Sequence, residues 1–197
     1  KNMKSILEIY SNLWEVSKED RFMGETFINE VYKDAKPQLT VVDIGAFTGE
    51  FSFYCLPFSK QIFAIEPDPV PFAQLKKYVE DFNLSNMSVF PIAIGRKDEV
   101  RKITFTHDGG SHFGEEAESE IETLTLSTFM KQNNIEHVDI LKVDVEGTEP
   151  EIFGPGFEEV MLKIDLIIGE HGGFNLLKRY GFKVDVKEGE IFLATRP

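Results

Sequence analysis

Two acidic residues flank a glycine-bearing turn near position 45, and this turn restricts the kind of ligand that the chain can bind. The apolar run from Val41 passes through Asp43 into Gly45, Gly49 and Glu50. In a dinucleotide-binding GxGxxG turn, closely spaced glycines and a helix N-terminus surround a pyrophosphate with backbone N–H groups. The third glycine is absent here, and two carboxylates beside a pyrophosphate would repel it. The turn therefore favours a nucleoside ligand without phosphate.

S-adenosylmethionine fits this description, because its amino acid end presents an ammonium and its sulfonium is positive. Its ribose and adenine still need close approach of the backbone, which Gly45 and Gly49 permit. Ala46 and Phe47 belong to the same turn. We expect these four residues and Asp43 to contact the cofactor.

A further acid ends the next predicted strand. Glu66 is followed by Pro67 and Asp68 and lies a little over twenty residues beyond Asp43. An ionised carboxylate at this spacing can accept hydrogen bonds from both ribose hydroxyls. Pro67 then ends the strand and directs the turn toward the ligand. The alternative is that Glu66 caps the next helix, a role that suits Asp68 better.

The strand after that closes with small and apolar residues. Ala93 and Ile94 stand near its end, and we expect them to line an adenine pocket, where flat apolar walls and backbone polar groups suffice. An ordinary core strand would have much the same composition.

The densest group of polar residues surrounds position 144. Lys142 alternates with apolar residues in a strand that should be buried, so its ammonium must find a carboxylate or a polar cleft. Asp144 and Glu146 follow at the carboxyl end of this strand, where ligands bind in open α/β sheets. We expect these three residues to help activate the methyl acceptor. The alternative is that the two acids steady the next helix through Thr148.

Glu170 and His171 stand at the end of another predicted strand. A histidine beside the methyl donor could act as a general base near neutral pH, although an ordinary surface histidine would fit the same position. If Asp144, Glu146 and Glu170 converge, their oxygens would suit Mg²⁺ or Ca²⁺. The sequence leaves the metal undetermined.

Hydrophobic periodicity predicts the elements that position these residues. Strands are expected at 39–44, 61–65, 88–94, 138–143, 164–168, 183–186 and 190–194. Helices are expected at 49–57, 69–82, 126–132, 149–153 and 175–180. This alternation indicates a doubly wound, mostly parallel α/β sheet with helices on both faces. Residues 187–189 indicate a hairpin turn, and hence a C-terminal antiparallel edge.

The remaining segments are less regular. Helical patterns at 3–16 and 26–34 predict an N-terminal helical extension over residues 1–38, before a Rossmann-like core at 39–197 in a single domain. Residues 101–106 suggest a further strand, and 107–116 suggest either a mobile substrate loop or a purely structural one. The other histidines show no metal-ligand spacing: His107, His112 and His137.

Composition limits the partners of this 197-residue chain. A formal net charge of −13 argues against nucleic acid and anionic membranes as partners. No apolar run approaches the ~20 residues that span a bilayer. Cys55 has no second cysteine to pair with, so a reducing cytoplasmic setting is expected, with Cys55 buried rather than reactive. Because the chain begins at Lys1, a leader or anchor upstream remains open.

Taken together, the motifs resemble those of the FkbM family of S-adenosylmethionine-dependent methyltransferases. The matching segments are 42–46 with Gly49, 64–67, and most specifically 139–147 with Glu149. Two positions depart from the usual family pattern. Phe47 stands where an asparagine is common and would alter how the methionyl end is held, and Ser127 stands where an aspartate is common but can still cap a helix.

The resemblance implies a class I methyltransferase fold and O-methylation of a hydroxyl on a sugar, glycan or secondary metabolite. Two other hypotheses remain open on the sequence. One is a nicotinamide-dependent oxidoreductase on the same scaffold, which the acidic turn disfavours. The other is a non-catalytic module that binds the cofactor or a protein partner.

Overall fold

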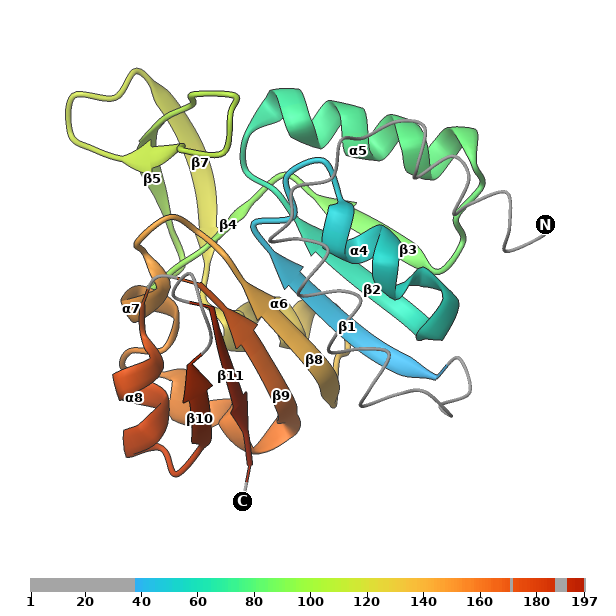
Figure 1. Cartoon of the computed structure of the whole chain (residues 1–197). Helices are drawn as coiled ribbons and strands as arrows, with labels where there is room; N and C mark the ends of the chain where they lie inside the picture. The colour runs from blue at the N-terminus through green and yellow to red at the C-terminus, as the bar shows by residue number, and fades with distance from the viewer. Residues whose placement is uncertain (1–37, 171, 187–190, 197) are drawn as a thin grey trace.

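The computed structural model describes residues 38–170, 172–186 and 191–196, in which a seven-stranded sheet forms the centre of the molecule (Figure 1). The strand order is β10-β11-β9-β8-β1-β2-β3. The strands are β1 (Leu39–Ile44), β2 (Ser59–Ile65), β3 (Met87–Phe90), β8 (Val138–Val143), β9 (Ile164–Gly169), β10 (Lys183–Val186) and β11 (Phe192–Thr195). Only β11 runs antiparallel to its neighbours, β9 and β10. The predicted mostly parallel sheet with a C-terminal antiparallel pair is therefore confirmed.

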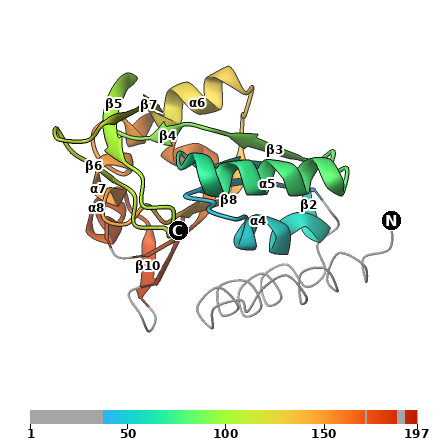
Figure 2. The ribbon, with the colours of Figure 1, turned by 90° about the horizontal axis from the view of Figure 1, so that it is seen from above.

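Helices cover both faces of this sheet (Figure 2). They are α4 (Glu50–Cys55), α5 (Pro69–Asp81), α6 (Leu126–Gln132), α7 (Glu149–Ile152) and α8 (Phe174–Arg179), with 3₁₀ turns η2 (Leu56–Phe58), η3 (Phe157–Glu159) and η4 (Met161–Lys163). Alternate residues of a strand face opposite sides, so Val41 packs in a core with Leu75 of α5. Val42 packs in a second core with Phe129 of α6.

A second, four-stranded sheet stands beside the first. Its order is β4-β7-β5-β6, formed by β4 (Ala93–Ile94), β5 (Glu99–Thr104), β6 (His112–Phe113) and β7 (Ser119–Leu124). The predicted single strand 88–94 is wrong, since it divides between the two sheets at Pro91, whose missing N–H cannot join a ladder. The predicted strand 101–106 corresponds to β5, whereas β7 was not predicted because exposed glutamates obscure its pattern.

Several other sequence predictions concern particular segments. The N-terminal helical extension and the turn at 187–189 lie outside the described residues. Within the described part of the chain, no helix combines the length and apolar character needed to cross a bilayer. Cys55 is the last residue of α4 and is fully buried, and burial raises the pKa of its thiol well above the ordinary value, which opposes formation of a reactive thiolate.

Candidate functional site

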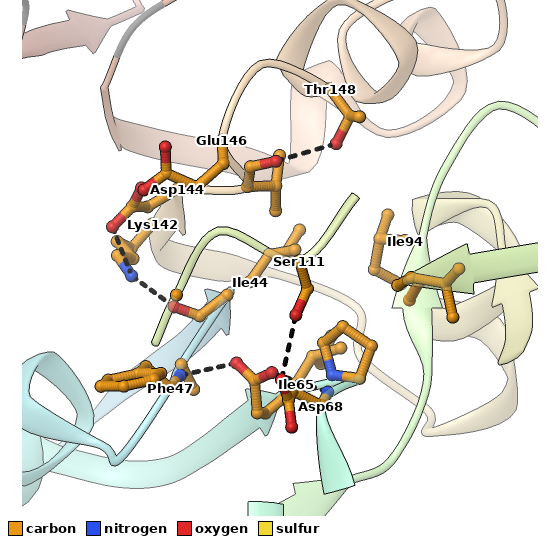
Figure 3. A pocket seen from close by; sticks show the side chains of 18 of the residues that line it. Ile44, Phe47, Ile65, Asp68, Ile94, Ser111, Lys142, Asp144, Glu146 and Thr148 are labelled. Carbon is orange, nitrogen blue, oxygen red and sulfur yellow. Dashed lines mark hydrogen bonds and ion pairs between the residues drawn. The ribbon is translucent and has the colours of Figure 1, made fainter. Parts of the chain in front are cut away.

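A cavity of ≈ 360 Å³ opens at the carboxyl ends of β1, β2 and β8 (Figure 3). Its volume lies within the range common for small-molecule sites. The turns after these three strands form one side, and the second sheet forms the other. Ten predicted site residues line it: Gly45, Ala46, Phe47, Glu66, Pro67, Ala93, Ile94, Lys142, Asp144 and Glu146.

The other predicted site residues lie elsewhere. Asp43 points into the interior, where its Oδ2 accepts a 2.7 Å hydrogen bond from Ser52 Oγ of α4. Gly49 faces α5, since a Cβ there would lie 2.4 Å from Leu75 Cδ1. Neither these residues nor Glu170 belong to the described cavity lining. His171 lies outside the described residues.

Lys142 connects the two strands at the centre of the sheet. Lys142 of β8 lies opposite Asp43 of β1 in the parallel register of these two strands. Its Nζ donates to the carbonyl of Gly45 at 2.7 Å and lies 3.4 Å from Asp43 Oδ1 and 3.3 Å from Asp144 Oδ2. The prediction that this buried ammonium must find a carboxylate or a polar cleft is confirmed, since it meets two carboxylates. Lys142 thus holds together the two turns that form the floor of the cavity.

The turn after β1 requires glycine at position 45. A Cβ on Gly45 would lie 1.8 Å from the carbonyl oxygen of Asp144, and its φ is +77°. The backbone N–H groups of Gly45 and Ala46 both donate to the carbonyl of Ile65 at 3.0 Å. Close approach of backbone to backbone, which only glycine allows here, therefore brings the β1 and β8 turns together.

Glu66 lies at the end of β2 with its side chain almost wholly buried at the cavity wall. Its Oε2 accepts the N–H of Phe47 at 2.7 Å, and its Oε1 accepts the N–H of Asp68 at 2.8 Å. Burial raises the pKa of Glu66 to about 7, although both hydrogen bonds and Lys142 act in the opposite direction. Each oxygen retains a further acceptor position for a ligand.

Phe47 adopts a left-handed backbone conformation, with φ of 48°. This conformation costs a residue other than glycine about 1–2 kcal/mol. The hydrogen bond from its N–H to Glu66 compensates for that cost, because bonds to a carboxylate are among the stronger ones. Asp68, as expected, caps α5 by accepting the N–H of Val70 at 3.0 Å.

The turn between β8 and α7 carries Asp144 and Glu146 to the cavity. Its backbone is unusual, with φ of 53° at Glu146 and 100° at Gly147. Glu149 holds this conformation: its buried Oε1 accepts the N–H groups of Val145 at 3.3 Å and Gly147 at 3.1 Å. The sequence places Glu149 in the family motif, but no structural role is predicted for it. Its position three residues after Glu146 is the feature that could have indicated that it holds this turn.

Beyond the predicted Ala93 and Ile94, the second sheet supplies wall residues that the sequence did not reveal. Ile103 of β5 and Phe113 of β6 line the cavity. The guanidinium of Arg101 lies 3.6 Å from the ring centroid of Phe113 and donates to Glu151 Oε2 of α7 at 2.7 Å. The cation therefore fixes an aromatic wall and ties the second sheet to α7. No local motif marks these residues, because their positions depend on pairing between strands distant in sequence.

A cluster of charged and polar side chains, formed around His137, Asp139 and Asp165, lies at the amino ends of β8 and β9, away from the cavity. His137 Nε2 is 2.9 Å from Asp165 Oδ2 and 3.8 Å from Asp139 Oδ1, although His137 showed no metal-ligand spacing in the sequence. Asp139 also accepts the N–H of Thr40 at 2.7 Å, and Arg196 pairs with Asp165. These contacts link the starts of β1, β8 and β9 with the end of β11, at the opposite end of the sheet from the cavity.

The strand order and the place of the cavity define a class of enzyme. A parallel sheet with a final antiparallel strand, and a ligand cavity at its carboxyl edge, is the class I S-adenosylmethionine-dependent methyltransferase fold. Precorrin-6y C5,15-methyltransferase of Geobacter metallireducens GS-15 has this fold, with TM-score 0.56 and 14% identity over 92% of this chain and 89% of its own. An rRNA methylase of Streptococcus thermophilus gives TM-score 0.54 and 11% identity over 93% and 100%.

The methyltransferase FkbM domain matches residues 43–184, and the chain therefore belongs to the FkbM methyltransferase family. A relative from Beauveria bassiana (strain ARSEF 2860), named Methyltransferase 1, is 27% identical over 201 residues, covering 83% of this chain and 80% of its own. The FkbM resemblance inferred from the motifs is thus confirmed. The chain is a methyltransferase that depends on S-adenosylmethionine rather than a nicotinamide-dependent oxidoreductase.

Proposed function

We propose that the cavity binds S-adenosylmethionine through Glu66 and that the enzyme methylates a hydroxyl group of a sugar, glycan or secondary metabolite. The observation that carries the cofactor site is the buried carboxylate of Glu66 at the cavity wall, held by two backbone N–H groups. Its remaining acceptor positions suit the two ribose hydroxyls. The choice of acceptor rests on family membership.

The rest of the cavity supports the same ligand. Ile65 and Ile94 offer apolar surface for an adenine ring. Among the described lining residues the acids are Glu50, Glu66, Asp68, Asp144 and Glu146, against a single lysine, Lys142. This balance favours a positively charged, phosphate-free cofactor by Coulomb's law. A solved protein of the same fold, SMU.1697c of Streptococcus mutans, holds SAH, with TM-score 0.56 and 8% identity over 91% of this chain and 97% of its own.

The same charges make a phosphorylated acceptor unfavourable. Lys142 is engaged by Gly45 and Asp144, and Arg101 is engaged by Glu151. Neither cation is therefore arranged to receive a phosphate group from the acceptor. An uncharged or cationic hydroxyl compound fits the cavity better, which agrees with the acidic net charge of the whole chain.

The enzyme's own residues have two tasks in this reaction. When bound, S-adenosylmethionine supplies an electrophilic methyl group on its sulfonium. The protein must align the acceptor oxygen with that methyl group and take up the hydroxyl proton. We assign proton removal to Asp144 or Glu146, which project from the β8 turn at the cavity (Figure 3). Lys142 positions Asp144 by its 3.3 Å ion pair.

The divalent metal that the sequence leaves undetermined finds little support in the donor set. Glu170 does not join Asp144 and Glu146 in the cavity lining. Within the described ranges, the single close group of three potential ligands is His137, Asp139 and Asp165, at the other end of the sheet. Proton removal is therefore assigned to the carboxylates alone.

Calorimetric titration with S-adenosylmethionine, S-adenosylhomocysteine and NADH tests the cofactor. We expect the first two to bind and NADH not to bind; the reverse pattern refutes the cofactor site. Transfer of a radiolabelled methyl group to a panel of neutral sugars, glycans and phenols, each paired with its phosphate ester, tests the reaction. Cofactor binding without transfer to any member would favour the non-catalytic module.

A further inference from the structure

The segment between β5 and β6, residues 105–111, lies across one side of the cavity, and we call it the strap. Gly109 and Ser111 of the strap line the cavity. Residues 106–110 are otherwise exposed. An exposed segment with few apolar contacts has low local stability unless specific bonds hold it. The question is therefore which bonds keep the strap against the cavity.

The buried carboxylate of Asp68 makes three contacts with the strap. Its Oδ2 accepts the backbone N–H of His107 at 2.9 Å and the hydroxyl of Ser111 at 2.9 Å (Figure 3). Its Oδ1 lies 2.7 Å from His107 Nδ1. Asp68 itself is only 2% exposed, so the acceptor end of each bond is sheltered from water, while the donors in the strap are more exposed. His107 has φ of 65°, in the left-handed region that is uncommon for residues other than glycine, and these bonds hold it there.

The two oxygens of Asp68 have different tasks. Oδ1 accepts the N–H of Val70, which caps α5, and also contacts His107 Nδ1 of the strap. Among the hydrogen-bond donors in the described residues, Oδ2 contacts only the strap. The backbone N–H of Asp68 meanwhile donates to Glu66 Oε1 at 2.8 Å. A continuous set of hydrogen bonds therefore runs from the turn at Phe47 through Glu66 and Asp68 to the strap.

We propose that Asp68 is a positioning residue that latches the strap against the cavity, so that order in the strap and occupation of the cavity by the cofactor favour each other. The coupling follows because a ligand in the cavity can contact Gly109 and Ser111 only while the strap is latched. A ligand shifts an equilibrium toward the state in which it has more favourable contacts. The cofactor half of this proposal rests on the proposed function, whereas the latch itself does not.

Two variants separate the latch from the helix cap. In Asp68→Asn, the amide oxygen can remain at the Oδ1 position and cap α5, while the NH₂ group faces the N–H of His107 and cannot accept it. Ser111→Ala removes one latch bond and leaves Asp68 intact. It also removes the acceptor of the Thr106 N–H within the strap, so the exchange of Thr106 is left out of the comparison. Thr106→Ala is the matched control in the same strap, because the Thr106 hydroxyl donates to Asp108 rather than to Asp68.

Amide hydrogen exchange of residues 105–111 and the dissociation rate of S-adenosylhomocysteine report the result. We expect Asp68→Asn and Ser111→Ala to accelerate both by about tenfold, the loss expected for one sheltered hydrogen bond. Both rates in Thr106→Ala should stay within about twofold of wild type, because a substitution away from the latch changes stability little. Unchanged exchange at the start of α5 will show that the cap persists.

The outcomes separate the latch from the cofactor site. If amide hydrogen exchange in the strap is as slow in Asp68→Asn and Ser111→Ala as it is in Thr106→Ala, the latch is overturned, whether or not ligand is present. If Asp68→Asn fails to fold, Ser111→Ala still decides this point. S-adenosylhomocysteine that binds without slowing strap exchange in wild type overturns the coupling. Failure of wild type to bind it refutes the proposed cofactor site instead, and exchange in the unliganded variants still tests the latch.

Discussion

Replacement of Glu66 by glutamine is the most direct test of the cofactor site. The carboxylate accepts Phe47 N–H and Asp68 N–H and, in the proposed complex, the ribose hydroxyls. Glutamine keeps one acceptor oxygen and turns an NH₂ group toward the other donors. A hydrogen bond to a charged group contributes about 1.5–3 kcal/mol. We therefore expect binding of S-adenosylmethionine to weaken by roughly 10- to 150-fold.

The pH dependence of binding gives a second, independent readout. Burial raises the pKa of Glu66 from 4.5 to about 7. As the pH falls through about 7, the carboxyl takes up a proton and loses acceptor capacity, so the dissociation constant of S-adenosylmethionine should rise. The rise approaches tenfold per pH unit well below the pKa, as expected for a single titrating group. Glu66→Gln should show a nearly flat profile between pH 6 and 8.

The free energy of unfolding should change with pH in the opposite sense to the affinity for S-adenosylmethionine. Because the pKa in the folded protein lies above 4.5, the folded state binds more protons between pH 4.5 and 7, and Glu66 stabilises the fold as the pH falls through this window. Above pH 7, burial of the charge costs about 3 kcal/mol, at about 1.4 kcal/mol per pKa unit. Glu66→Gln removes this cost, but its NH₂ group then faces one of the two backbone N–H donors, which loses its acceptor at a cost of about 1–3 kcal/mol. The net change in unfolding free energy at pH 8 should be small.

Calorimetric titration at pH 6, 7 and 8 measures the affinities, and urea unfolding at pH 8 measures stability. Glu122→Gln on β7 is the matched control, because Glu122 is exposed and lies outside the cavity lining. Wild-type affinity in Glu66→Gln, together with an unchanged pH profile, would refute the role assigned to Glu66. Weak binding in a variant that has also lost its fold would be recognised from the unfolding curve.

Three further predictions concern the floor of the cavity. Gly45→Ala should destabilise the protein by about 2–4 kcal/mol, from the clash with the Asp144 carbonyl and the positive φ; Gly147→Ala, with positive φ but open space, should lose less, and equal losses in urea unfolding would contradict the clash. Lys142→Met should cost about 3–5 kcal/mol, since Asp43 is left buried without its cation; adding Asp43→Asn should recover part of that loss, and strict additivity would argue against the pair. Asp144→Asn or Glu146→Gln should lower kcat by about 100-fold with little effect on cofactor affinity; full activity in both variants excludes them as the base.

Much of the fold follows from local pattern. The nearly continuous apolar runs of β1 and β8 and the helical spacing of α5 depend on which residues exclude water, a property that each segment carries wherever it lies. Glu66 and Asp68 were placed by the same means, because a strand end followed by proline restricts the next few residues. The class of cofactor likewise followed from the charges around one turn.

Other features depended on contacts between distant segments. The polar strand β7 exists because it pairs with β5 and β4, and its exposed glutamates conceal it in the sequence. Asp43 belongs to the cofactor motif, yet its side chain contacts Ser52 and Lys142 and lies outside the cavity lining. Which face of a strand meets a cavity is decided by the packing around it.

The sequence by itself indicated most strands and helices of the seven-stranded sheet, the glycine turn and the acid at the end of β2, which are local properties of residue type, spacing and charge. Its motifs also carried the resemblance to the methyltransferase family. Tertiary structure alone decided that the second sheet walls the cavity, that Asp68 reaches the strap 39 residues away, and that Lys142 bridges two turns. The physical reason is that such bonds join atoms whose separation is set by strand pairing and packing, not by distance along the chain.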